Sequence, residues 1–113
     1  MDYTFKIQGS ADEPYTVRLT NTSGDFKAIC DCPAGNRLVM CKHVLPFFEN
    51  KLPKDIIEGD VNALEEIHAA FQQSEGAPVL QEMQHIEQQM AVLKKELANR
   101  KKQLARVTLG GTI

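Results

Sequence analysis

The positions of the cysteines constrain this chain more than any other feature. All three lie between residues 30 and 43, together with one of the three histidines, in the spacing C-x-C-x8-C-x-H. Alternate side chains of an extended segment share a face, so Cys30 and Cys32 can point at one ion, and Cys41 and His43 repeat that spacing. Three thiolates and one imidazole complete the tetrahedral shell of zinc and leave no position for water. The pattern therefore predicts one structural Zn²⁺ per chain, held by these four residues.

Other uses of the cysteines fit the sequence less well. A disulfide framework is disfavoured because the number of cysteines is odd and no secretory segment precedes them. A cysteine nucleophile with a histidine base needs an activated thiol, an orienting group and a substrate pocket, and we find no pattern for these. We therefore expect no enzyme. A thiol-based redox switch stays open as an alternative, and it predicts an exchangeable, reactive thiol.

The residues around the four ligands resemble a known family. C-x-C followed after a gap by C-x-H is similar to the SWIM zinc finger, and YTVRLTNTSGDFKAICDCPAG and CKHVLPFF resemble the strands and the helix that flank its ligands. The resemblance covers residues 14 to 50. It implies that Cys30, Cys32, Cys41 and His43 are the zinc ligands. It also implies that the chain binds nucleic acid or protein, often as an accessory to recombination or transposition.

Charge is unevenly distributed along the chain, whose formal net charge is −2. Residues 44–75 carry seven acids and two bases, whereas residues 94–106 carry six bases and one acid. We find no strongly basic domain, which would have indicated nucleic-acid binding. No stretch approaches the ~20 apolar residues of a membrane span and no signal peptide is recognisable, so we expect a soluble, cytoplasmic protein.

Alternation of apolar and polar residues predicts three short strands, at residues 3–7, 15–20 and 26–30. The simplest arrangement is an antiparallel meander that ends at the first ligand pair, followed by a zinc knuckle and a short helix over residues 43–50. Such a sheet buries little apolar surface. Zinc must therefore contribute on the order of 10 kcal/mol or more to folding, and without metal we expect disorder. We place this SWIM-like zinc-finger domain at residues 1–52.

Residues 53–75 are predicted to form an acidic linker followed by an amphipathic helix. Asp60 is a suitable N-cap for a helix that ends near Gln73. His68, beside the apolar face of that helix, is interpreted as a partly buried structural histidine. The apolar face consists of Val61, Leu64, Ile67, Ala70 and Phe71.

Pro78 is well placed as the first residue of the last helix. A heptad pattern over residues 79–107 predicts a coiled coil, followed by a frayed tail at residues 108–113. Such a helix is roughly 40 Å long. The apolar residues of its heptad pattern form a seam along one side, which must be buried against another helix. We expect pairing between chains, as a homodimer or larger oligomer, rather than a hairpin with residues 60–73. The fold class is therefore α+β: a small antiparallel sheet with a zinc knuckle and short helix, then helices that include a C-terminal coiled coil. Arg100 interrupts the predicted oligomer seam, which consists of Met83, Ile86, Met90, Leu93, Leu97, Leu104 and Val107.

These features predict a zinc-dependent adaptor that recognises a protein or nucleic-acid partner and self-associates through its C-terminal helix. Lys27, Arg37 and Lys42, near the zinc loop, are the candidate partner contacts. The basic residues of 94–106 are interpreted as a solvated helix face, since no aromatic residue accompanies them. An alternative is a phage or mobile-element accessory protein that inhibits a host protein through the acidic face of residues 49–75.

Overall fold

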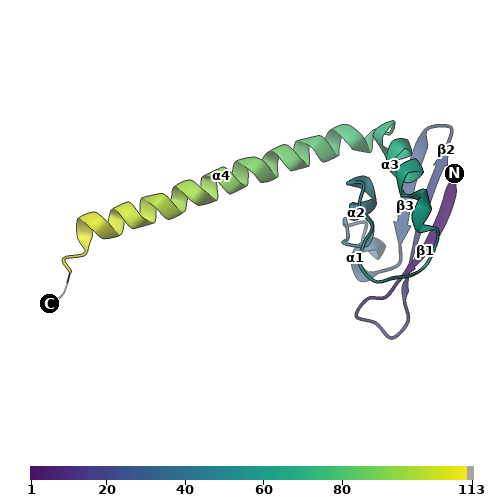
Figure 1. Ribbon diagram of the computed structural model, residues 1–113, viewed down its shortest axis with the longest axis horizontal. Helices are drawn as coiled ribbons and strands as arrows, with labels where there is room; N and C mark the ends of the chain where they lie inside the picture. Colours follow the sequence, from purple (N-terminus) through teal and green to yellow (C-terminus); the bar gives the residue numbers. More distant parts are fainter. Residues whose placement is uncertain (112–113) are drawn as a thin grey trace. The chain divides into compact units, whose positions relative to one another are not determined.

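The computed structural model describes residues 1–111 of the chain. These residues divide into two compact units, of which the first is Met1–Ala77 and the second begins at Pro78. The first unit contains a small antiparallel sheet with short helices, and the second is dominated by one long helix (Figure 1). The predicted α+β class is confirmed, whereas the coiled coil stays a prediction.

The sheet has one more strand than the sequence predicts. All neighbouring strands are antiparallel, and the first three form the expected meander. The additional strand pairs with the first strand of the chain, so that first strand lies inside the sheet and not at its edge. In the spatial order β3-β2-β1-β4, the strands are β3 (Asp25–Cys30), β2 (Tyr15–Thr22), β1 (Asp2–Ile7) and β4 (Ile56–Glu58).

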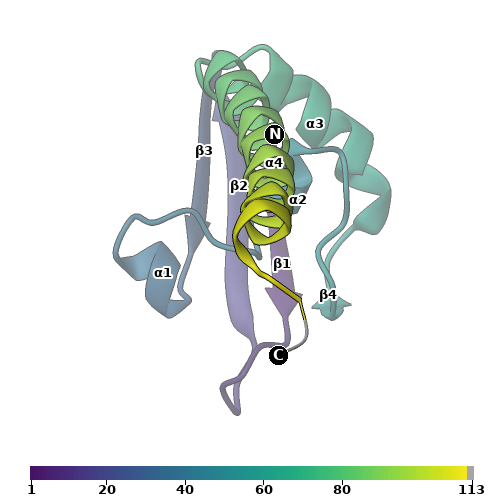
Figure 2. The ribbon, with the colours of Figure 1, turned by 90° about the vertical axis from the view of Figure 1, so that its left-hand side faces the viewer.

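One face of the sheet forms the hydrophobic core. Two short helices, α2 (Leu45–Phe48) and α3 (Leu64–Gln72), lie on this side of the sheet (Figure 2). Pro46 falls in the first turn of α2, where its missing N–H breaks no helical hydrogen bond. Apolar residues that alternate along β1 and β2 supply most of the buried face. The fully buried side chains among them are Phe5, Ile7, Val17 and Leu19.

Aromatic side chains attach both helices to the sheet. Phe71 of α3 stacks on Phe48 of α2, with ring centroids 4.2 Å apart, and Phe26 of β3 meets both rings edge-on. The hydroxyl of Tyr3 on β1 donates a hydrogen bond to the carboxylate of Glu66 on α3. The helix at 64–72 is therefore part of the same core as the strands.

Residues 53–75, predicted as a separate linker and helix, lie within the first compact unit. Their first part supplies β4, and their helix packs on the sheet. The side chain of Asp60 accepts a hydrogen bond from the N–H of Asn62 at 3.0 Å, as expected of an N-cap. The first turn is a 3₁₀ helix, η1 (Val61–Ala63). This tighter turn leaves Val61 exposed and buries Ala63 in its place, contrary to the prediction for Val61.

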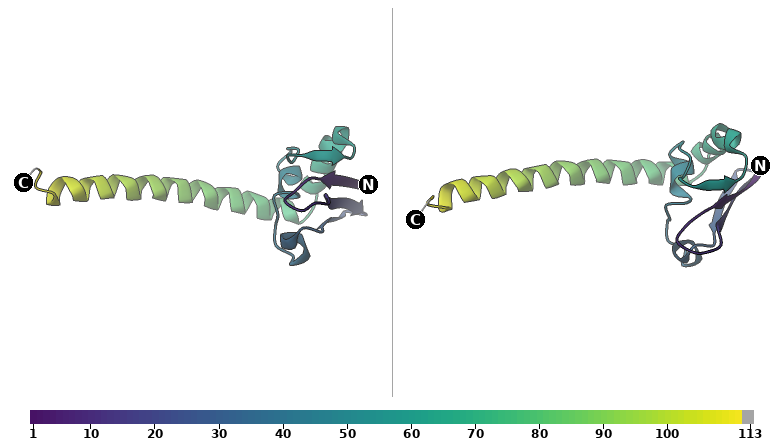
Figure 3. Two further views of the ribbon diagram at one scale, coloured as in Figure 1. Left: turned by 90° about the horizontal axis from the view of Figure 1, so that it is seen from below. Right: turned by 60° about the horizontal axis from the view of Figure 1, so that its bottom comes forward.

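The long helix α4 extends over Gly76–Thr108 without interruption (Figure 3). It begins two residues earlier than Pro78 because the Ser74 hydroxyl accepts a hydrogen bond from the N–H of Gly76 at 3.3 Å. The predicted seam is exposed in the single chain, and the exposed fraction of its residues ranges from 36% at Met83 to 72% at Val107. Within the described part of the chain, no other residues bury this seam.

One further expectation concerns the C-terminal region. The predicted tail at 108–113 begins where α4 ends, and its last two residues, 112 and 113, lie outside the described residues. Among residues 1–111, no helix is both long enough and apolar enough to cross a lipid bilayer.

Candidate metal centre

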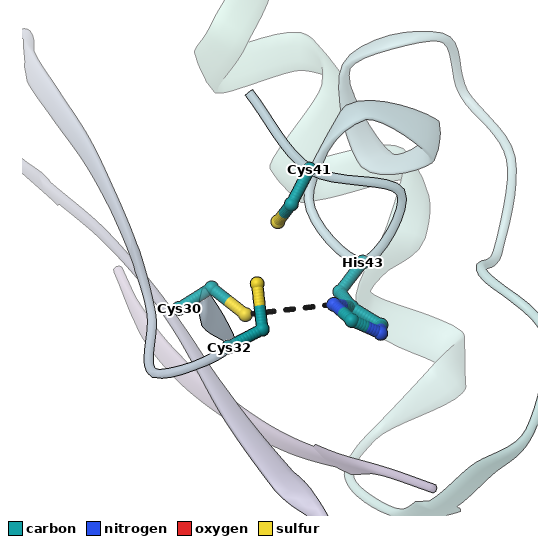
Figure 4. A group of neighbouring side chains, drawn as sticks. All are labelled: Cys30, Cys32, Cys41 and His43. Carbon is teal, nitrogen blue, oxygen red and sulfur yellow. Dashed lines mark hydrogen bonds between the residues drawn. The ribbon is translucent and has the colours of Figure 1, made fainter. Parts of the chain in front are cut away.

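Four metal-ligand side chains converge at the end of the sheet. One ligand atom from each of Cys30, Cys32, Cys41 and His43 lies within 4.8 Å of the other three. The side chains point toward a common centre from two separate segments of chain (Figure 4). All four residues are buried. The structure thus brings together the four residues that the sequence predicts as ligands, and this cluster could hold a metal ion.

The first ligand pair is positioned by the end of β3 and the start of α1 (Pro33–Asn36). Cys30 is the last residue of β3, and Cys32 is the N-cap of α1, where its Sγ accepts a hydrogen bond from the N–H of Gly35 at 3.2 Å. Asp31 between them points away, and its carboxylate accepts a hydrogen bond from the N–H of Thr16 at 2.8 Å. This bond anchors the turn to β2 and leaves both sulfurs on the inner side.

Gly35 allows α1 to approach the end of β3 closely. A Cβ atom added at this position would lie 2.1 Å from the carbonyl oxygen of Cys30. That distance is far below any allowed contact, so only glycine fits here without movement of the backbone. The same glycine donates the hydrogen bond to Cys32, so one residue supports both members of the first ligand pair.

The second ligand pair lies on the turn that leads into α2. The carbonyl oxygen of Cys41 accepts hydrogen bonds from the N–H groups of Val44 and Leu45 at 3.3 and 3.1 Å. This turn places the sulfur of Cys41 and the ring of His43 on the same side (Figure 4). The ring of Tyr15 packs against the imidazole, with centroids 5.1 Å apart, and limits its rotation. This contact therefore helps to keep the imidazole facing the three sulfurs.

Burial and hydrogen bonding give the ligands different proton affinities. Burial raises the pKa of the Cys30 thiol to about 12. Burial acts in the same direction on Cys32, but the N–H of Gly35 and the neighbouring thiols outweigh it and lower the pKa of Cys32 below its usual range. Burial also lowers the pKa of His43, and the charge of Lys42 adds to this effect. His43 is thus neutral near pH 7, as a metal ligand must be.

The spacing of the donors is suited to a tetrahedral ion. With metal–sulfur bonds of about 2.3 Å and metal–nitrogen bonds of about 2.0 Å, tetrahedral geometry places neighbouring donors roughly 3.5 to 3.8 Å apart. The Sγ of Cys30 lies 3.8 Å from the Nδ1 of His43, and all four donor atoms lie within 4.8 Å of one another. Three sulfurs and one imidazole form a donor set that prefers soft or borderline metals over calcium and magnesium. The geometry and chemistry of the site therefore fit one four-coordinate ion.

The three predicted partner contacts do not form one cluster. Arg37 and Lys42 line a cavity beside the metal centre. Lys27 lies elsewhere, on the outward face of β3, where its ammonium is 3.5 Å from the carboxylate of Asp25. All three basic side chains are exposed. The structure thus supports a shared surface for Arg37 and Lys42 only.

A group of exposed apolar residues, which the sequence does not predict, lies next to the metal centre. The loop between the ligand pairs presents Leu38, which is 96% exposed, followed by exposed Val39 and Met40. Leu38 has a left-handed φ of 58°, which is uncommon for a residue with a branched side chain. Together with Ile29 of β3, these three residues line one cavity. We call these four residues the loop patch. The run of three apolar residues inside a predicted loop is the sequence signal for it.

No family model, curated protein or solved structure matches this chain. The resemblance to the SWIM finger therefore rests on the spacing of the four ligands and on the residues that flank them. The structure adds that these four residues meet in space, which is a property of zinc fingers in general.

Proposed function

We propose that the metal centre is a structural zinc site, held by Cys30, Cys32, Cys41 and His43. The observation that carries this proposal is the convergence of four buried donors of the types that zinc prefers. Four protein ligands fill the coordination sphere of zinc, so the ion stabilises the fold and has no open position for a substrate. The ion joins the end of β3 to the turn before α2.

The first unit then acts as a SWIM-type binding module, and its partner surface surrounds the zinc loop. The loop patch supports a protein partner, because a fully exposed leucine beside other apolar residues gains by burial against another protein. Arg37 and Lys42 add positive charge to a second cavity, which shares Met40 with the loop patch. A nucleic-acid partner would instead need aromatic stacking or a larger basic surface.

The second unit provides self-association. A helix with an exposed apolar seam and charged flanks is the typical component of a coiled coil. Pairing through α4 would present two binding modules at once, so two weak contacts with a partner would act together. The chain is therefore proposed to be an adaptor and not an enzyme.

Native mass spectrometry of the purified chain tests the metal and the self-association together. We expect one zinc per chain and a mass of two chains or more. A chain that carries no zinc when purified in zinc-containing medium would contradict the structural site. A monomeric mass at micromolar concentration would contradict self-association and leave the zinc site standing.

The partner surface is tested by substitution of its most exposed residue. Leu38→Asp places a charge in the loop patch, and Val61→Asp is a matched control at another exposed position of the same unit. We expect a protein from lysate to be retained by immobilised wild type and by the control, and to be lost from Leu38→Asp. Equal retention by all three would contradict the proposed surface.

A titration of labelled DNA and RNA at low salt tests the nucleic-acid alternative. Binding that weakens with salt, with a slope of about 0.9 per contacted phosphate for duplex DNA, would favour that alternative over a protein partner.

A further inference from the structure

The charges of α4 are separated along its length. Its first half, residues 76–93, carries two acids and no base. Its second half, residues 94–106, carries six bases and one acid. The helix is continuous through both halves, so the two charge segments lie end to end on one rigid element. A helix of this kind has an acidic end and a basic end.

A parallel pair of α4 helices would place like charges together. Each residue would lie beside the same residue of the second copy, so the two basic halves would face each other along their whole length. Arg100 occupies a seam position, and in a parallel pair it would meet Arg100 of the second copy inside the apolar seam. Two unpaired guanidinium groups at a seam are strongly unfavourable.

An antiparallel pair removes both conflicts. With Met90 opposite Leu93 of the second copy, Ile86 lies opposite Leu97, and Val79 lies opposite Leu104. The same register places Arg100 opposite Met83, which is flanked on its own helix by Glu82 and Glu87. Each arginine in the seam can then reach acidic side chains of the other chain.

We propose that the exposed seam of α4 is covered by a second copy of this chain that runs in the opposite direction. This inference rests on the self-association stated under the proposed function, and it adds the direction and the register. The argument is charge complementarity, because the acidic half of each helix lies along the basic half of the other. Glu87 lies near Lys94 of the second copy in this register, twice per pair. The two binding modules are attached at opposite ends of the pair.

Cysteine cross-linking tests the direction. Val79→Cys and Leu104→Cys are prepared separately, loaded with zinc so that the native thiols are bound, and oxidised gently, alone and as a mixture. In the antiparallel register, residue 79 faces residue 104, so we expect a disulfide-linked dimer only in the mixture. Wild-type protein oxidised in the same way is the control for the native cysteines.

The other outcomes contradict the proposal in distinguishable ways. Cross-linked dimers from each variant alone would show a parallel pair, and self-association would still stand. A mass of two chains without any cross-link in the mixture would also overturn the antiparallel register. A monomeric mass would overturn self-association itself and this inference with it.

The salt dependence of the wild-type dimer provides a second test that needs no substitution. In an antiparallel pair, opposite charges attract and salt screens that attraction, so we expect the dissociation constant from sedimentation equilibrium to rise between 50 and 500 mM NaCl. In a parallel pair, salt would screen repulsion, and the dissociation constant would fall. A fall would therefore overturn the proposal.

Discussion

The substitution Gly35→Ala tests the way in which the fold positions the metal centre. Gly35 lies in α1 and has no left-handed φ, so alanine meets no backbone strain there. Alanine is favoured over glycine in a helix by about 0.5 to 1 kcal/mol, so intrinsic propensity alone would make the variant more stable. The expected effect has the opposite sign, because of the contact with Cys30.

The size of the effect follows from the distances. The new Cβ would lie 2.1 Å from the carbonyl oxygen of Cys30, and an ordinary carbon–oxygen contact is about 3.3 Å, so the two segments must separate by about 1 Å. Metal ligands must hold their positions to within about 0.2 Å. The residues that separate carry Cys30 and Cys32. We therefore expect zinc affinity to fall about 10- to 100-fold, as for the loss of a supporting contact, which corresponds to ~1.4 to 2.8 kcal/mol.

Competition with a chromophoric chelator measures this affinity. Gly110→Ala is the matched control, since a Cβ at Gly110 has no atom within 4 Å. We expect the control to bind zinc as tightly as wild type. Equal zinc affinity in Gly35→Ala and wild type, or a gain in stability of the zinc-loaded variant, would refute this account of how α1 meets the strand.

Three other predictions follow from the same structure. Removal of zinc with a strong chelator should abolish the dispersed amide NMR signals of residues near the metal centre. The helical far-UV CD signal, which comes largely from α4, should change little. Amide signals of the first unit that stay the same without metal would contradict a structural role for zinc. Phe71→Ala should lower the free energy of unfolding of the zinc-loaded protein by about 3 to 5 kcal/mol in urea denaturation, because Phe71 is buried against Phe48 and Phe26. Leu38→Ala, at an exposed position, is the control and should change this free energy by less than about 0.5 kcal/mol. Zinc affinity should rise with pH between 6 and 8, roughly tenfold per unit for each proton released, because free thiols have a pKa of about 8.5 and must lose their protons to bind the metal, and burial in the folded site raises the pKa of Cys30 further; an affinity independent of pH would show that the ligands are already deprotonated.

The sequence predicts the main strands and the ligand set for clear physical reasons. Alternation over β1 and β2 is long enough to define which face is buried, and the core residues follow from it. The four ligands are recognisable because thiols and imidazoles at this spacing have few other uses. These features are encoded locally, in short stretches of chain.

Features that depend on distant contacts are not predictable in this way. β4 has three residues, too few to show an alternating pattern, and it exists because β1 offers a free edge. The start of α3 depends on the 3₁₀ turn after Asp60, which rotates Val61 outward. Residues 53–75 join the first unit through the Phe48, Phe71 and Phe26 contacts, which no local pattern reveals.

The place of β1 inside the sheet has a consequence for the order of events on the ribosome. The chain from β1 to His43 contains the hairpins and all four ligands, whereas β4 and α3 are made later. At roughly 5 to 20 residues per second, more than a second separates His43 from Phe71. A nascent chain therefore exposes all four ligands before the helix that completes its core emerges from the ribosome, and it can bind its ion at that stage. At that stage the metal would stabilise a three-stranded sheet. One edge of β1 would stay unpaired until residues 56–58 form β4.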